Sequence, residues 1–171
     1  GSFITLIISV ILLGVVMVGI IPGLPSIASQ FELFFVNTMG FGFGTGVLVF
    51  MLVLIGGLSY AVYYSHKTGK RLLNTSLLAL GFILIGYFSY GIIVIRSQFN
   101  PPIDMNDPEN VMTFTSYLKR EQYGDRPLLK GPKFTADRPN YVKTSPVYTP
   151  VKDAKGKDKY IISDYKVEAE Y

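Results

Sequence analysis

Three stretches without a charged side chain, each long enough to cross a lipid bilayer, lie within the first 95 residues of this 171-residue chain. They run from about Phe3 to Ile21, from about Phe41 to Tyr63 and from about Thr75 to Ile95, which is 19, 23 and 21 residues. At roughly 1.5 Å per residue, such helices span a hydrocarbon core of about 30 Å. Lipid offers the backbone no hydrogen-bond partners, so the sequence predicts three transmembrane helices, near 3–21, 41–63 and 75–95.

Charge divides the chain into two parts. Only four charged residues precede Arg96, and the other 24 lie from Arg96 onward. We therefore expect a transmembrane region over residues 1–96 and a water-exposed segment over residues 97–171. With no cysteine and a single histidine, His66, the chain offers no disulfide framework and no zinc site, and no cofactor is evident. The basic residues form no concentrated face, so nucleic acid is not an expected partner.

The loop between the second and third stretches sets the expected orientation. It carries Lys67, Lys70 and Arg71 and no acid, and short basic loops stay in the cytoplasm. The connection over residues 22–40 and the C-terminal segment then lie on the other side, in the periplasm or a lumen.

Two prolines follow the first stretch. Pro22 is expected to end the first helix, and Ser26 to cap a short amphipathic helix over about 26–39 that Gly40 ends. This helix either lies in the outer membrane interface or packs under other spans.

Glycines alternate from Gly40 to Gly46. No strand precedes them and no lysine follows, so a phosphate-binding loop is disfavoured. Their spacing instead fits close packing between helices, or a local kink. Other transmembrane helices, from the same protein or a complex, are therefore expected partners, together with the lipid bilayer.

The outer segment is expected to be a small α+β unit. Asp107 is a suitable N-cap and Pro108 a suitable first residue for a helix over about 108–123. Alternating apolar residues on both sides of Gly156 predict a β-hairpin over about 147–166. The predicted fold class is thus membrane α-helical, with three spans, a short interfacial helix and this outer unit.

Six polar residues near the outer interface are candidates for holding a lipid phosphate or another substrate. They are Arg96, Asn100, Asp104, Arg120, Asp125 and Arg126. Each has a structural alternative: Arg96 as a helix-end anchor in the interface, Asp104 as a turn residue, and the last three as an ion-pair cluster. No catalytic residue and no metal ligand is assigned.

Two motifs carry a resemblance to a known family. They are Asn-Pro-Pro-Ile-Asp-Met-Asn-Asp-Pro-Glu-Asn from residue 100 and Tyr-Leu-Lys-Arg-Glu-Gln-Tyr-Gly-Asp-Arg-Pro-Leu-Leu from residue 117. The chain from residue 96 to 132 resembles large multispan membrane proteins of Bacteroidota of unknown function. That family is similar to the transmembrane protein O-mannosyltransferases, which have a GT-C-type architecture.

The resemblance implies transfer of a sugar from a polyprenyl-phosphate donor to a protein, at the outer face of the bacterial inner membrane. Members of the family have more spans and an acidic motif in an early outer loop, whereas here that loop carries only Glu32. We therefore expect an internal fragment of a glycosyltransferase-like protein that does not catalyse by itself. The alternative is a non-catalytic membrane anchor or assembly subunit that presents the outer segment to a protein partner.

Overall fold

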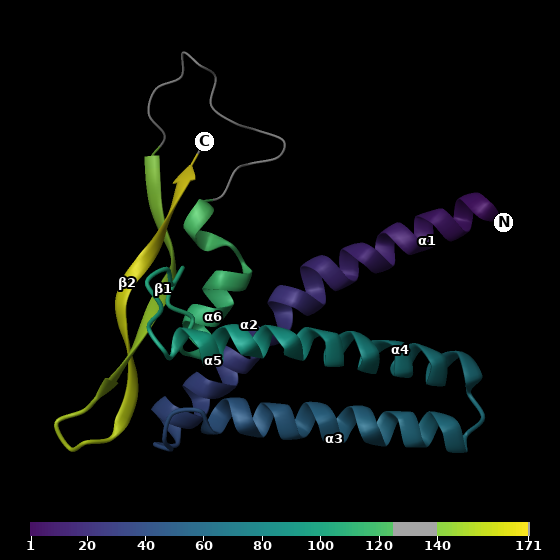
Figure 1. The fold of residues 1–171 in the computed structure, drawn as a ribbon, viewed down its shortest axis with the longest axis horizontal. Helices are drawn as coiled ribbons and strands as arrows, with labels where there is room; N and C mark the ends of the chain where they lie inside the picture. Colours follow the sequence, from purple (N-terminus) through teal and green to yellow (C-terminus); the bar gives the residue numbers. More distant parts are fainter. Residues whose placement is uncertain (125–139, 171) are drawn as a thin grey trace, which may run out of the picture.

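The computed structural model describes residues 1–124 and 140–170. Long helices extend from one end of the molecule, and a two-stranded hairpin lies across their ends, with a short helix beside it (Figure 1). The elements, in chain order, are α1 (Ser2–Gly14), η1 (Val15–Ile20), α2 (Ile21–Leu33), η2 (Phe34–Thr38), α3 (Thr45–Lys67), α4 (Arg71–Tyr87), η3 (Phe88–Tyr90), α5 (Gly91–Ser97), α6 (Val111–Leu118), η4 (Glu121–Tyr123), β1 (Asn140–Lys152) and β2 (Asp158–Glu170).

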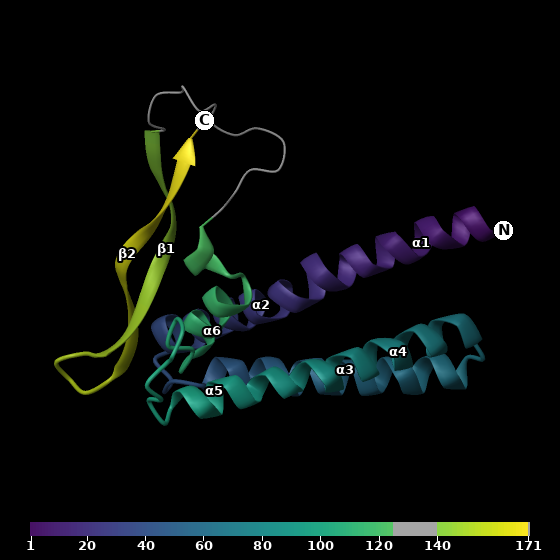
Figure 2. The same cartoon turned by 45° about the horizontal axis from the view of Figure 1, so that its top comes forward.

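Three helical stretches are long and apolar enough to cross a membrane: Ser2–Thr38, Thr45–Lys67 and Arg71–Ser97. Their number agrees with the three apolar runs of the sequence. Helices α3 and α4 lie side by side and antiparallel, joined by a short turn, in both ribbon views (Figures 1 and 2). Most of their side chains are exposed, as those of helices surrounded by lipid would be.

The prolines do not end the first helix. The predicted break at Pro22 and the predicted separate interfacial helix over 26–39 were therefore wrong. The helix runs without interruption from Ser2 to Thr38. A π-helical stretch, Val15–Ile20, precedes Pro22, and the Ile21 amide bonds to the carbonyl of Val16, five residues back. Such a shifted register, together with the place of Pro22 in the first turn of α2, allows a proline where a regular helix would break. Ser26 is therefore not a cap.

The second half of this helix packs against protein. Ala28, Ser29 and Glu32 on α2, and Val36 beyond it, are buried. Helix α2 contacts both α3 and α6. Of the two expectations for residues 26–39, packing under other helices is the one that the structure supports.

The glycines between the first two spans have separate functions. Gly40 and Gly44 have positive φ angles of 74° and 84° and form the turn, not a helix face. Gly46 lies in α3, where a Cβ atom would lie 2.5 Å from the carbonyl oxygen of Phe31. The predicted close helix packing is thus found at Gly46, and the spacing of the others comes from the turn.

Helix α6 is shorter than the predicted 108–123. It starts at Val111, and the side chain of Asn110 caps it by accepting hydrogen bonds from the amides of Met112 and Thr113, at 2.9 and 3.0 Å. Asp107 is not the cap, because its backbone has a φ of 43° and its carboxylate lies near Ser97. Beyond Leu118 the chain turns through Arg120, which has a φ of 56°.

The β-hairpin is confirmed, with strands longer than predicted. Asn140–Lys152 pairs with Asp158–Glu170 in antiparallel register, with two irregularities. Gly156 occupies the turn with a φ of 74°. The strands run across the ends of α3 and α5 at a steep angle to these helices in both views (Figures 1 and 2).

Candidate functional site

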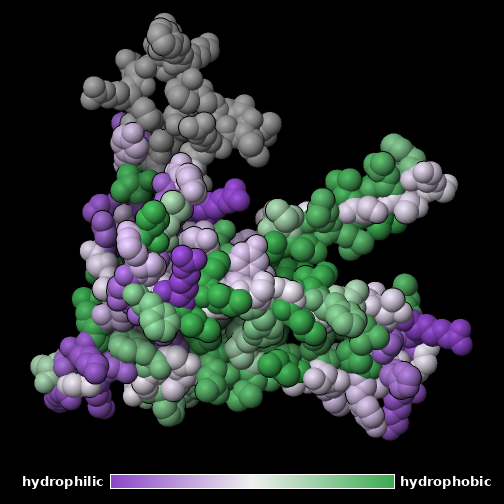
Figure 3. All heavy atoms as spheres, in the orientation of Figure 1, coloured by the Kyte–Doolittle hydropathy of each residue, from purple (hydrophilic) through white to green (hydrophobic). Residues whose placement is uncertain are grey.

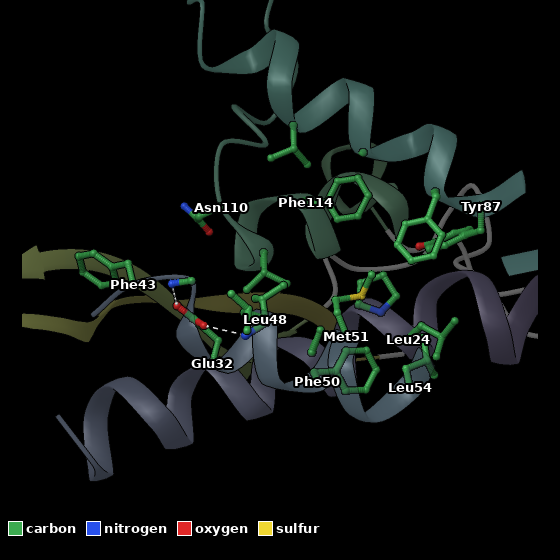
Figure 4. Close-up of a pocket in the computed structure, with 18 of the residues that line it drawn as sticks. Leu24, Glu32, Phe43, Leu48, Phe50, Met51, Leu54, Tyr87, Asn110 and Phe114 are labelled. Carbon is green, nitrogen blue, oxygen red and sulfur yellow. Dashed lines mark hydrogen bonds between the residues drawn. The ribbon is translucent and has the colours of Figure 1, made fainter. Parts of the chain in front are cut away.

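A cavity of about 620 Å³ lies where the candidate spans meet α6, at the end of α3 opposite the Lys67–Arg71 turn. Residues of α2, α3, α4, α5, α6 and strand β2 line it (Figure 4). The lining is largely aliphatic and aromatic: Leu24, Pro25, Ala28, Val47, Leu48, Phe50, Met51, Leu54, Leu84, Tyr87, Phe88, Val94, Val111, Phe114 and Tyr160 contribute to it. Glu32, Glu109 and Asn110 are its polar side chains.

Glu32 is a buried carboxylate in the wall of this cavity, with 1% of its surface exposed. One oxygen accepts a hydrogen bond from the Gly44 amide at 2.5 Å, and the other accepts one from the Val47 amide at 3.1 Å (Figure 4). These amides belong to the N-terminus of α3, where the helix dipole favours a negative charge. The carboxylate therefore stabilises the start of α3, and both of its oxygens are occupied.

Strand β2 is attached to this end of the helices through Asn37 and Tyr160. The Asn37 side chain donates to the Tyr160 carbonyl at 2.9 Å and accepts from the Tyr160 amide at 2.8 Å, as a neighbouring strand would. The Tyr160 ring packs edge-on against Phe43, with 5.0 Å between centroids. Burial, and after it the nearby Glu32 carboxylate, raises the pKa of the Tyr160 phenol above its ordinary value.

The same strand has a second attachment near its other end. Lys166 forms an ion pair with Glu121, just beyond α6. Burial raises the pKa of the Glu121 carboxyl, but hydrogen bonds from Lys166 and Ser116 and the charges of Lys166 and Lys119 outweigh it, so that the pKa lies below its ordinary value. Strand β2 thus connects the end of the first helix to the end of α6.

Helices α2 and α6 also meet directly. The Ser29 hydroxyl lies 3.0 Å from the Thr115 hydroxyl, and both residues are buried. On the other wall, the Tyr87 hydroxyl donates to the Ile21 carbonyl at 2.7 Å. Specific polar contacts as well as apolar packing therefore hold together the helices that line the cavity.

The predicted site residues do not gather at this cavity. Arg96 is exposed. Val94, two residues earlier on the same helix, lines the cavity. Two residues correspond to about 200° of rotation around a helix, so Arg96 lies on the face away from the cavity. Asn100 is exposed in a turn with a φ of 46°, and Arg120 is exposed beyond α6. Neither arginine makes an ion pair with another described residue. Asp125 and Arg126 lie outside the described residues.

Asp104 has a structural contact. Its carboxylate accepts a hydrogen bond from the hydroxyl of the buried Ser97 at 2.6 Å, and Asp107 accepts a longer one at 3.4 Å. The pair joins the segment after α5 back to the end of that helix. Within the described residues, no three acidic or histidine side chains cluster closely enough to hold a metal ion.

Sequence reasoning missed Glu32, Asn37, Tyr87 and Tyr160 as members of one site. Glu32 did carry a signal, because it is the only acid before Asp104 and a lone charge in apolar surroundings needs partners. The others gave none, since their roles depend on which distant backbone groups they meet.

Comparison with protein-family models, curated proteins and solved structures finds no match to this chain.

Proposed function

We propose that this chain belongs to a membrane glycosyltransferase-like protein and holds the hydrocarbon part of a polyprenyl-phosphate sugar at the outer face of the bacterial inner membrane. The observation that carries the proposal is the apolar cavity of about 620 Å³ at the end of α3 opposite the Lys67–Arg71 turn. The resemblance of residues 96–132 to the Bacteroidota family supplies the class of donor.

The cavity has the chemistry that an isoprenoid chain requires. Its volume lies in the usual range for small-molecule sites, about 300–1,000 Å³. Apolar cavities of this kind take apolar ligands rather than water. Glu109 and Asn110 lie where the cavity meets the outer segment, at the level where the polar head of such a donor would emerge.

The orientation of the donor follows from charge. Lys67, Lys70 and Arg71 lie at the opposite end of α3 and α4 from the cavity. If that turn is cytoplasmic, as its charge favours, the cavity faces the periplasm, where the outer segment also lies.

Binding and positioning, rather than proton transfer, are the proposed contributions of this chain. Glu32 is the acid most deeply placed in the cavity wall, but both of its oxygens accept backbone hydrogen bonds. A carboxylate whose two oxygens already accept hydrogen bonds is a poor general base. The acceptor hydroxyl would be activated by acidic groups elsewhere in the full protein.

A photoreactive polyprenyl-phosphate analogue tests the proposal on the chain in nanodiscs. Met51→Trp fills the cavity, whereas Leu52→Trp, one residue further along α3, adds the same bulk on an exposed face. We expect labelling to fall severalfold in the first variant only, with the label mapped to α3 and α6. Equal labelling of the two variants would show that the analogue does not bind in the cavity.

The same labelling tests Arg96 as a phosphate ligand. Arg96→Ala lowers labelling if the guanidinium reaches the donor phosphate from its exposed position. Unchanged labelling would leave Arg96 as an anchor in the membrane interface.

An anchor or assembly subunit is the second candidate function, and one observation favours it. The hairpin, outside the candidate spans, exposes apolar side chains that a protein partner would cover. They include Val142, Val147, Ile161, Ile162, Tyr165 and Val167. This function predicts no labelling by the analogue and a stoichiometric partner whose binding is lost in Ile161→Asp.

A further inference from the structure

The tip of the β-hairpin concentrates positive charge. Over the eight residues from Lys152 to Lys159, here named the basic tip, four lysines accompany two aspartates. The lysines are Lys152, Lys155, Lys157 and Lys159. All four are exposed, and none makes an ion pair with another described residue.

The two aspartates are already engaged by backbone amides. Asp153 accepts from the Ala154 amide at 2.8 Å, and its carbonyl accepts from the Gly156 amide at 2.7 Å, which shapes the turn. Asp158 accepts from the Phe43 amide at 3.0 Å. These carboxylates keep their negative charge, so four lysines and two aspartates leave the basic tip with a net charge of +2.

The position of the basic tip relative to the candidate spans is fixed. The bond from Phe43 to Asp158 attaches the base of the tip to the connection between the first and second spans. The paired bonds between Asn37 and Tyr160 attach it to the end of the first span. The strands cross the ends of α3 and α5 rather than continuing along them, in both ribbon views (Figures 1 and 2). The hairpin thus lies across the ends of the candidate spans rather than along them (Figures 1 and 2).

Apolar side chains adjoin the charge. Met39, Phe41 and Phe43 are exposed on the same connection, and apolar side chains beside cations can be buried at the boundary between headgroups and acyl chains. In the space-filling view a hydrophilic cluster at the hairpin tip lies next to the apolar ends of the helices (Figure 3). A cluster of about four or more cations next to a membrane span is an arrangement that binds anionic lipid headgroups.

We propose that the basic tip rests on anionic lipid headgroups and holds the hairpin against the membrane. The inference uses neither the cavity nor the glycosyltransferase proposal, and it applies to whichever face of the membrane the hairpin occupies. The attraction is electrostatic, so it should weaken when salt shortens the Debye length.

The chain contains no cysteine, which makes a single-site probe possible. Ala154→Cys, carrying a fluorophore, reports the basic tip in nanodiscs that contain headgroup-quenching lipids. We expect quenching to rise about twofold when roughly 30% phosphatidylglycerol replaces phosphatidylcholine. The increase should disappear in about 0.5 M NaCl.

Substitution of all four tip lysines by Gln should abolish the increase. The matched control is Lys67→Gln with Lys70→Gln at the other end of the helices, which should leave it intact. Quenching that is equal in the two lipid mixtures, or that persists without the tip lysines, would overturn the proposal. All six substitutions lie at exposed positions, so the fold is retained.

Discussion

The hydroxyl of Tyr87 lies 2.7 Å from the carbonyl oxygen of Ile21 and donates a hydrogen bond to it. In a regular helix that carbonyl would accept from the amide four residues later, but residue 25 is a proline and has no amide hydrogen. A side chain from the third candidate span thus supplies the donor that the first one lacks. Such compensation is how helices within a membrane tolerate internal prolines.

Tyr87→Phe should therefore lower the free energy of unfolding by about 1 kcal/mol, because it leaves the Ile21 carbonyl without a donor. Pro25→Ala restores an amide donor, so the same tyrosine substitution should cost much less in that background. Titration with a denaturing detergent measures both. Tyr90→Phe, on the next turn, is the control, and an equal cost of Tyr87→Phe in both backgrounds would exclude this explanation.

Glu32→Ala should destabilise the chain by about 2–4 kcal/mol, because the amides of Gly44 and Val47 both lose their acceptor in a buried place. Glu32→Gln should cost less, since its carbonyl oxygen still accepts one bond. Thermal unfolding in detergent gives the order of the variants. Glu109→Gln, an exposed acid at the edge of the same cavity, should have little effect.

Gly46→Ala should cost about 1–3 kcal/mol, because the added methyl group meets the backbone of α2. Gly57→Ala, further along the same helix, has open space and should change stability by less than about 1 kcal/mol in either direction. Unfolding free energies of the two variants make the comparison. Equal losses of unfolding free energy in the two variants would mean that the close approach of α2 and α3 at Gly46 does not contribute to stability.

Asn37→Ala should release the start of strand β2. The amide of Tyr160 would lose its acceptor, so its hydrogen exchange should speed up by about tenfold. Amides paired within the hairpin, such as those near Thr149, should change less. Uniform acceleration along the strand would indicate loss of the hairpin rather than of its attachment.

The ion pair between Glu121 and Lys166 should make stability depend on pH. The pKa of Glu121 is lower in the folded chain than in the unfolded one, so the pair stabilises above the ordinary carboxyl value of 4.5 and is lost as pH falls through the lower folded pKa. Both side chains are partly exposed, which limits the effect to about 1 kcal/mol or less. Glu121→Gln should remove this component from melting curves recorded between about pH 6 and pH 3.

Much of the helical architecture could be predicted from the sequence. Uncharged runs of bilayer length need no knowledge of neighbours to be recognised, and the hairpin followed from alternation around Gly156. The break at Pro22 was wrong because local rules treat proline as a helix terminator, whereas here a π-helical stretch and Tyr87 supply what the prolines remove. The start of α6 was misplaced for a similar reason, since Asp107 bonds elsewhere and Asn110 takes its place.

The site was predicted less well than the fold. The candidate site residues were chosen from a dense group of polar residues that follows the third span. The cavity is instead lined mainly by apolar residues, which look in the sequence like any other residue of a membrane span. Only the contacts between distant segments distinguish Met51, which lines the cavity, from Leu52, which does not. Contacts such as the one between Asn37 and Tyr160, 123 positions apart, lie beyond any local pattern.

The two attachments of strand β2 have a mechanical consequence. Tyr160 is bonded to the end of the first helix, and Lys166 is paired with Glu121 just beyond α6. The part of β2 between these two residues therefore links two helices that line the cavity. Helix α6 cannot swing outward without either breaking the ion pair at Lys166 or carrying the hairpin with it. Movement of α6 is therefore coupled to movement of the hairpin, and the ion pair, worth about 1 kcal/mol or less, limits how strongly the two are coupled.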